Sequence, residues 1–233
     1  MNRILAQRGA TMAGNDERAE NSSSVAHDEF VELIATLSAS PDAETQGEIK
    51  KTVWERFGTN GATFISDMAN FSSTSRSLGI CHFLKMIYRA REIVAPIISA
   101  NNGTLLKCDA DNCYAYFPDV SDAIRSSCDL NKELFRINQD HEVEEHIYLS
   151  VGIDYGDLLL IGDNEFFGDP VNTASKLGED LAKKGETLVT DRALDRSTFD
   201  VDENAERMVA RISNIEISYV RIPMTQSTKG MIA

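Results

Sequence analysis

The chain has 233 residues, of which 42% are hydrophobic and 26% charged, and this composition suits one globular domain with a core of its own. Its formal net charge of −14 would repel nucleic acid and anionic membranes, so we expect neither as a partner. No apolar run reaches the length of a membrane span or a signal-peptide core, and the cysteines show no CxxC spacing. We therefore expect a cytoplasmic protein whose cysteines are reduced core residues.

Four segments are expected along the chain: a disordered tail, a helical lead-in, a main domain and a flexible C-terminal tail. Their expected bounds are 1–26, 27–58, 59–223 and 224–233. In the lead-in, apolar residues recur at helical spacing from Phe30 to Leu37. Asp42, next to a proline that breaks the first helix, is a suitable N-cap for a second one.

The main domain alternates predicted strands and helices. The expected strands are 62–66, 104–108, 113–117, 147–154, 157–162, 186–190, 209–213 and 215–222, and the expected helices 74–102, 119–137 and 169–185. Tyr155 and Gly156 are interpreted as the turn between the fourth and fifth strands, and Asp119 or Ser121 as the start of the second helix. This order predicts an α+β fold of ferredoxin-like or palm type, a βαββαβ mixed sheet with helices packed on it.

Two carboxylates stand where strands end. Asp67 follows the first predicted strand, and Asp111 lies in the tight turn of the following hairpin. In a split βαβ arrangement these strands are neighbours, so both acids can face one point, where a divalent cation would relieve their repulsion. Phe71 and Ser72, in a segment where a helix begins, are predicted to lie where backbone N–H groups meet a phosphate. A helix cap and a turn residue remain the alternative interpretation of the two acids.

Three motifs in this order resemble the class III nucleotidyl cyclases. They are "FISDMANFS" at 64–72, "KCDAD" at 107–111 and "GDPVNTASKL" at 168–177. The resemblance covers roughly residues 50–195 and identifies the segment 59–223 as a catalytic domain of that family. It implies a cyclase that forms a 3′,5′-cyclic nucleotide and pyrophosphate from a nucleoside triphosphate.

The resemblance also implies roles for individual residues. Asp67 and Asp111, helped by the backbone carbonyl of Met68, would hold two Mg²⁺ ions, with Mn²⁺ as a substitute. These ions would activate the ribose 3′-hydroxyl for in-line attack on the α-phosphate and neutralise the leaving pyrophosphate. Asn172 would position the ribose, and Lys176 would stabilise charge at the α-phosphate, where the family usually has an arginine. A solvated helix charge is the alternative interpretation of Lys176.

Base recognition would fall to Lys107 and Glu165, with ATP as the preferred substrate. The lysine can donate to adenine N1 and the carboxylate can accept from the exocyclic amine. These residues disfavour GTP and leave pyrimidine triphosphates open. An exposed loop acid is the alternative interpretation of Glu165.

Because family members divide each site between two subunits, the resemblance implies a homodimer with shared sites. A catalytically weak cyclase-like module, which binds nucleotide and signals by association, is the alternative function. The presence of Asp67, Asp111 and Asn172 argues against it, and the lysine at position 176 keeps it open. A diguanylate cyclase is disfavoured, because the hairpin has "CDADN" in place of that family's "GG[DE]EF".

Overall fold

The computed structural model describes residues 13–69, 79–162, 164–201, 205–212 and 215–222, with side chains from Ser23 onward. The chain forms two compact units. One comprises Met1–Thr59 with Leu159–Phe166, and the other Asn60–Leu158 with Phe167–Ala233. In the described ranges, every helix is too short or too polar to cross a membrane.

The first unit is built around two helices, α1 (Ala13–Ala39) and α2 (Ala43–Phe57). Asp42 caps α2 as predicted, because its side chain accepts a hydrogen bond from the Thr45 nitrogen at 2.7 Å. Phe57 packs edge-on against Phe30 of α1, with ring centroids 5.5 Å apart.

The prediction of a disordered tail over residues 1–26 is wrong for residues 13–26, which belong to α1. Two physical reasons account for this. No glycine or proline interrupts residues 15–40, and Ala26 packs with Phe30 against a buried cluster that includes Val53. Residues 1–12 and 223–233, which include the predicted C-terminal tail, lie outside the described residues.

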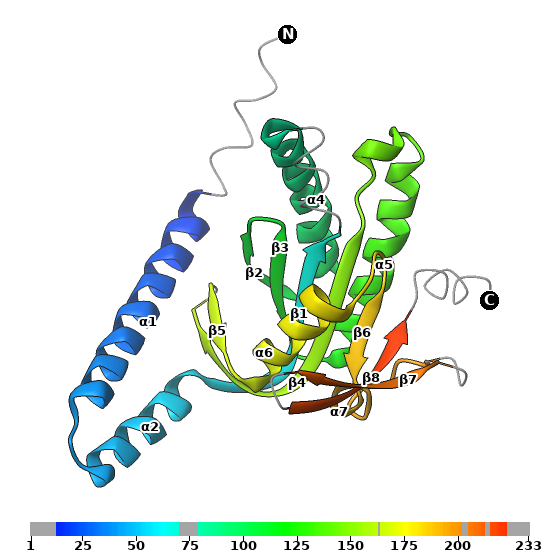
Figure 1. Ribbon diagram of the computed structural model, residues 1–233. Helices are drawn as coiled ribbons and strands as arrows, with labels where there is room; N and C mark the ends of the chain where they lie inside the picture. The colour runs from blue at the N-terminus through cyan, green and yellow to red at the C-terminus, as the bar shows by residue number, and fades with distance from the viewer. Residues whose placement is uncertain (1–12, 70–78, 163, 202–204, 213–214, 223–233) are drawn as a thin grey trace. The chain divides into compact units, whose positions relative to one another are not determined.

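An eight-stranded mixed sheet forms the centre of the second unit (Figure 1). The strands are β1 (Gly58–Met68), β2 (Thr104–Asp109), β3 (Asn112–Phe117), β4 (Leu149–Ile161), β5 (Glu165–Phe167), β6 (Thr187–Thr190), β7 (Arg207–Ile212) and β8 (Ile215–Ile222). Their order is β2-β3-β1-β4-β6-β8-β7, with β5 paired to β4. The β4–β6 pair is parallel, whereas β2–β3, β1–β3, β6–β8 and β7–β8 are antiparallel. The predicted α+β mixed sheet is confirmed.

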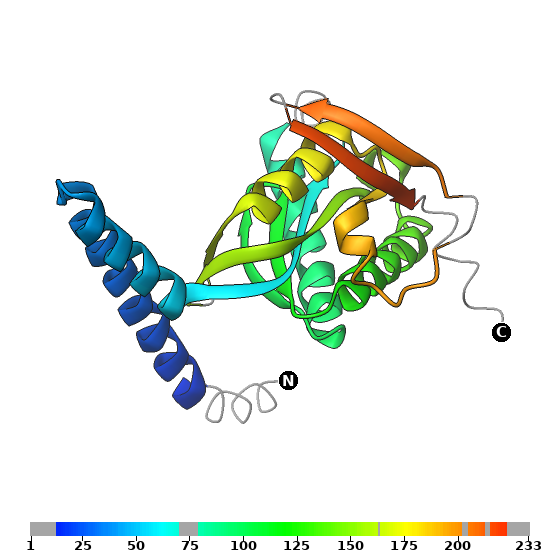
Figure 2. The same cartoon turned by 90° about the horizontal axis from the view of Figure 1, so that it is seen from below.

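Helices cover both faces of this sheet (Figures 1 and 2). The described helices of the second unit are α4 (Ile80–Ala100), α5 (Val120–Asn138), η1 (Val143–Glu145), α6 (Asp169–Ser175), the π-helical η2 (Lys176–Leu181) and α7 (Asp191–Leu194). Side chains of β6 alternate between the two faces. Val189 joins the core cluster formed with α4 and α5, whereas Leu188 packs against Leu177 of η2. The α6–η2 segment therefore lies on the face opposite α4 and α5.

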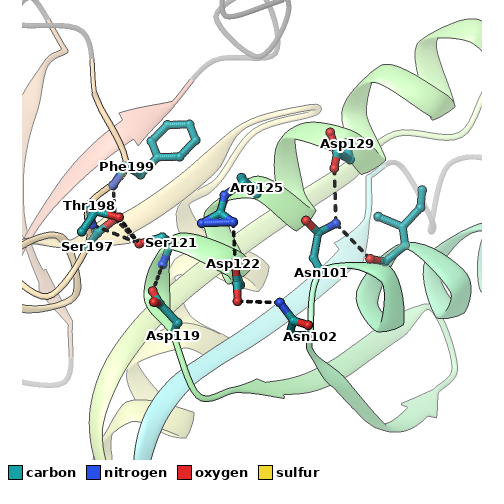
Figure 3. Close-up of polar contacts among 11 residues, drawn as sticks. Asn101, Asn102, Asp119, Ser121, Asp122, Arg125, Asp129, Ser197, Thr198 and Phe199 are labelled. Carbon is teal, nitrogen blue, oxygen red and sulfur yellow. Dashed lines mark hydrogen bonds and ion pairs between the residues drawn. The ribbon is translucent and has the colours of Figure 1, made fainter.

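Polar contacts connect the C-terminal end of α4 to α5 (Figure 3). Asn101 donates from Nδ2 to Asp129 at 3.2 Å, and Asn102 donates from Nδ2 to Asp122 at 3.0 Å. Asp119, one of the two predicted starts, is the N-cap of α5. These contacts join α4 to α5, and buried side chains of both helices share a core cluster with β1 and β3.

The predicted turn at Tyr155 and Gly156 is wrong, because β4 runs unbroken through both residues. The glycine has a packing role there. A Cβ atom at position 156 would lie 3.0 Å from Cγ of Pro170, so its absence lets the first turn of α6 approach the strand. The chain turns later, at Gly162, which has a φ of 56° and leads into β5.

The single helix predicted over residues 169–185 is also corrected. The α-helical winding ends at Ser175, a π-helix continues to Leu181, and Ala182 is extended. Cys81, predicted as a core residue, is exposed, whereas Cys113 and Cys128 are buried.

Replacing Gly152 by Ala is expected to destabilise the protein by about 3 kcal/mol, the upper part of the range for overpacking. The new Cβ would lie 2.6 Å from the Gly178 nitrogen and closer still to the Ala174 carbonyl oxygen, and both are backbone atoms of α6–η2. Gly47→Ala is the matched control. Nothing lies within 4 Å of a Cβ in that exposed turn of α2, so helix propensity should stabilise this variant by about 0.5–1 kcal/mol. Urea denaturation measures both changes, and equal stability of the two variants would contradict the close contact.

Candidate active site

The sheet brings the ends of β1 and the β2–β3 hairpin together. The β1–β3 register pairs Ala62 with Phe117 and continues as far as Ser66 with Cys113. Asp67 is the next residue on β1, and Asp111 lies in the turn just before β3. The antiparallel pairing therefore places both aspartates at one end of the sheet, as the sequence predicts.

The electrostatics of Asp67 reflect this proximity. Burial, the negative charge of Asp111 and a hydrogen bond with Asp111 raise the pKa of Asp67 to about 7, and the charge of Glu179 adds to the effect. The backbone N–H of Met68 acts in the opposite direction by hydrogen bonding to the carboxylate. Near neutral pH the two aspartates thus form a half-buried pair that resists carrying two negative charges.

A hard divalent cation fits this pair of carboxylates. Mg²⁺ and Mn²⁺ prefer oxygen ligands, and Mg²⁺ is commonly held by one or two carboxylates together with substrate phosphates. Within the described ranges, no group of three His, Cys, Asp or Glu side chains converges closely enough to bind a metal ion by itself. Backbone oxygens, water or the phosphates of a substrate would therefore fill the remaining coordination positions of a bound cation.

The turn that carries Asp111 is supported from α4. The guanidinium group of Arg91 donates to the carbonyl oxygens of Cys108, at 3.3 Å, and Ala110, at 2.7 Å. Ala110 has a φ of 48°, in the left-handed region that alanine rarely adopts. The hydrogen bond to its carbonyl helps to hold this conformation, and with it the position of the neighbouring aspartate.

Asn172 and Lys176 line one cavity of about 390 Å³ between α6–η2 and β8. They are four residues apart and share a face of the helix, as predicted. Three acids, Asp169, Glu179 and Asp180, also line this cavity. Its walls are therefore net acidic, and a polyanionic ligand would enter only together with cations.

Glu179, which is not among the predicted site residues, connects this cavity to the carboxylate pair. Its Oε1 atom accepts hydrogen bonds from Asn112 Nδ2 at 3.3 Å and from the Ser175 hydroxyl at 3.2 Å. Burial raises its pKa, and the charges of Asp180 and Asp111 add to that effect. One side chain thus links the hairpin turn to the α6–η2 segment within the same chain.

A second unpredicted network holds the start of α6. The fully buried carboxylate of Asp154 accepts from Thr190 Oγ1 at 2.5 Å and from Arg192 Nε at 2.7 Å. Arg192 also donates to Asp169 at 2.6 Å, three residues before Asn172. These residues come from β4, β6, α6 and α7, and no local sequence pattern relates them.

The two residues predicted to recognise the base fall in different units. Lys107 is exposed on β2, and its Nζ lies 5.1 Å from the centroid of the Tyr114 ring. Glu165 belongs to the first unit, where its Oε2 lies 3.3 Å from Nδ1 of His27. Phe71 and Ser72 lie outside the described residues.

Known proteins resemble both the sequence and the fold. No protein-family model matches the chain. "Putative adenylate cyclase 3" of Rhizobium meliloti (strain 1021) is 27% identical over 106 residues, which are 46% of this chain. The matched segment is only 18% of that relative's length, so the chain corresponds to a minor part of it.

Solved structures match a larger share of the chain. The adenylate/guanylate cyclase/hydrolase from Silicibacter pomeroyi is 25% identical, with a TM-score of 0.58 over 71% of this chain and 98% of its own. The adenylyl cyclase CyaB from P. aeruginosa shares the fold, with 17% identity and a TM-score of 0.58 over 71% of this chain and 95% of its own. The guanylyl cyclase Cya2 also shares it, with 16% identity and a TM-score of 0.62 over 70% of this chain and 91% of its own. The described domain is of the class III nucleotidyl cyclase type. The sequence similarity to the putative adenylate cyclase and to the adenylate/guanylate cyclase/hydrolase points to the same class of protein.

Replacing Asp67 by Asn is expected to raise the free energy of unfolding of the metal-free protein at about pH 8 by on the order of 1 kcal/mol, a figure discounted for water access. A carboxyl group with a raised pKa adds stability below its unfolded value of 3.8, and this stability is lost as the pH rises through about 7. Asparagine does not ionise, so the variant and parent should converge near pH 4 and diverge near pH 8. Urea denaturation in EDTA measures the difference, and one that stays constant with pH would contradict the carboxylate pair.

Proposed function

We propose that this chain is a metal-dependent adenylate cyclase, which converts ATP to 3′,5′-cyclic AMP and pyrophosphate. The observation that carries the proposal is the convergence of Asp67 and Asp111, with a pKa of about 7 for Asp67. A bound divalent cation would relieve the repulsion between these two carboxylates. Proteins bind nucleoside triphosphates as complexes with such cations. The similarity of the chain to adenylate and guanylate cyclases supports the same reaction.

Asp67 and Asp111 would hold two Mg²⁺ ions per site, or Mn²⁺ in their place, with the Met68 carbonyl as a further ligand. Bound there, the ions would supply Lewis-acid activation of the ribose 3′-hydroxyl and neutralise charge on the leaving pyrophosphate. The two aspartates would orient that hydroxyl towards the α-phosphate, and the half-buried position of Asp67 would limit access of competing water.

Asn172 and Lys176 would act on the substrate from α6–η2. The exposed asparagine amide would position the ribose, and the half-buried lysine would stabilise charge that develops on the α-phosphate. A lysine supplies the charge without the planar fork of arginine, so we expect turnover roughly 100-fold below that of a site with arginine.

Lys107 and Glu165 would select the base. The lysine would donate to N1 of adenine, and the carboxylate would accept from the 6-amino group. Guanine presents the opposite pattern at these two positions, which disfavours GTP. Phe71 and Ser72, in the segment after β1, would lie beside the phosphates.

The proposed active form is a homodimer with two sites, each built from both subunits. One subunit would supply Asp67 and Asp111, and its partner Lys107, Glu165, and the α6–η2 residues. The proposal rests on the resemblance to cyclases that divide their sites in this way.

Purified protein incubated with Mn²⁺ and each of the four ribonucleoside triphosphates should form cyclic AMP from ATP, identified by mass. Asp67→Ala should lower the rate of product formation by more than about 100-fold. Mutating a residue that only hydrogen-bonds to a metal ligand already lowers metal affinity or activity about 10–100-fold, and Asp67 would be a ligand itself. Asp109→Ala is the matched control, since Asp109 is an exposed acid of the same turn, and this variant should retain most of the activity.

A cyclic product from GTP, CTP or UTP alone would contradict the ATP preference. Nucleotide binding without any cyclic product would favour the alternative, a cyclase-like module that signals by association.

Mixing inactive Asp67→Ala chains with inactive Asn172→Ala chains should restore about a quarter of the parent activity. Random exchange makes half of the dimers mixed, and each mixed dimer holds one intact site of its two. Native mass spectrometry of isotope-labelled chains verifies the exchange. Complete exchange without recovered activity would overturn the shared-site arrangement.

A further inference from the structure

Two cysteines lie opposite one another in the hairpin that carries Asp111. Cys108 on β2 pairs with Cys113 on β3, one step inward from the pair Asp109–Asn112 that closes the turn. Their Sγ atoms are 2.7 Å apart, and both thiols are free. The proposed cyclase reaction assigns no role to either cysteine.

The geometry suits a bond between the two sulfurs. Facing residues of an antiparallel pair have Cα atoms about 4.5–5.5 Å apart, which lies within the range of about 4.4–6.8 Å for disulfides. A disulfide has an S–S length of about 2.0 Å, so closing the remaining gap takes a movement of less than 1 Å. The strands already hold the two side chains on the same face.

The two thiols also differ in ways that suit an attacking and a resolving cysteine. Cys108 is half-buried and open to small oxidants, whereas Cys113 is 4% exposed. The hydrogen bond with the Cys113 thiol, together with the positive charge of Arg91, lowers the pKa of Cys108. Thiolate character and access are the properties that make a cysteine reactive towards peroxides.

We propose that Cys108 and Cys113 are a site of reversible oxidation, at which hydrogen peroxide converts the two thiols into an intramolecular disulfide. The Cys108 thiolate attacks one oxygen of the peroxide and breaks the O–O bond, which yields a sulfenic acid and, after protonation, one water. The Cys113 sulfur then attacks the sulfenic sulfur, and the S–O bond breaks to release a second water. Both sulfurs are oxidised, the peroxide is reduced, and a dithiol reverses the step by exchange.

The disulfide would enclose residues 109–112, the turn that contains Asp111. A covalent ring of this size restricts the turn more strongly than the hydrogen bonds from Arg91 do alone. An effect on metal binding would rest on the proposed function, whereas formation of the disulfide would not. Oxidation can therefore be tested on the protein without any activity measurement.

The test treats the full chain with hydrogen peroxide, blocks remaining thiols with iodoacetamide, and digests with trypsin. Cleavage after Lys107 and Arg125 releases both cysteines in one peptide, 108–125, separate from Cys81 and Cys128. That peptide should carry no alkyl group and should be lighter than its reduced form by two hydrogen atoms. Dithiothreitol should restore two alkylation sites, and the peptides with Cys81 and Cys128 should stay alkylated.

Variants assign the two roles. Cys113→Ser should accumulate a sulfenic acid on Cys108 that reacts with dimedone, whereas the matched control Cys128→Ser should still form the disulfide. Full alkylation of peptide 108–125 after peroxide treatment, or pairing that involves Cys81 or Cys128 instead, would overturn the proposal. A failed activity assay would not affect this outcome, so the redox site and the proposed cyclase function are tested separately.

Discussion

The antiparallel register between β1 and β3 is the constraint on which the candidate site depends. It sets the end of a buried strand beside the tight turn of a hairpin, and each carries an aspartate. The core side chains of β1, such as the fully buried Phe64 and Ile65, fix that register, because a one-residue slip would turn each of them to the opposite face of the sheet and away from the side chains that it packs against. Hydrophobic packing thereby holds two carboxyl groups close together. The raised pKa of Asp67 shows that burial and the neighbouring charge of Asp111 disfavour its ionised form.

A second constraint holds the other group of candidate residues against the same sheet. Gly152 of β4 and Gly178 of η2 approach so closely that no Cβ fits between the backbones. This contact, the Arg192–Asp169 ion pair and the Glu179 hydrogen bonds fix α6–η2 at three points. In a dimer with shared sites, the two groups of one chain would serve different sites. Glu179 would then connect those two sites through a single subunit.

Much of this arrangement could be predicted because the signals are local. An acid directly after a buried strand, and another in an Asx-rich turn, define where Asp67 and Asp111 lie once neighbouring strands are paired. The course of β4 could not be predicted in the same way, because Gly156 matches a turn and a close packing contact equally well. The networks around Asp154 and Glu179 combine residues from distant elements, and the Cys108–Cys113 pair depends on a register that spacing alone leaves open.

The π-helical winding of η2 bears on the proposed role of Lys176, which stands where the cyclases that the chain resembles usually have an arginine. π-helical turns are rare and occur often at functional sites, and this one begins at Lys176. Because Gly178 is seated on the backbone of β1 and β4, the main chain two residues after the lysine has little freedom to move. The backbone at Lys176 is therefore held in place, but the ammonium group at the end of the flexible side chain can occupy a wider volume than an arginine guanidinium. It is also oriented less firmly than that planar group. The site would therefore keep its positive charge while losing orientation, which affects transition-state stabilisation more than substrate binding.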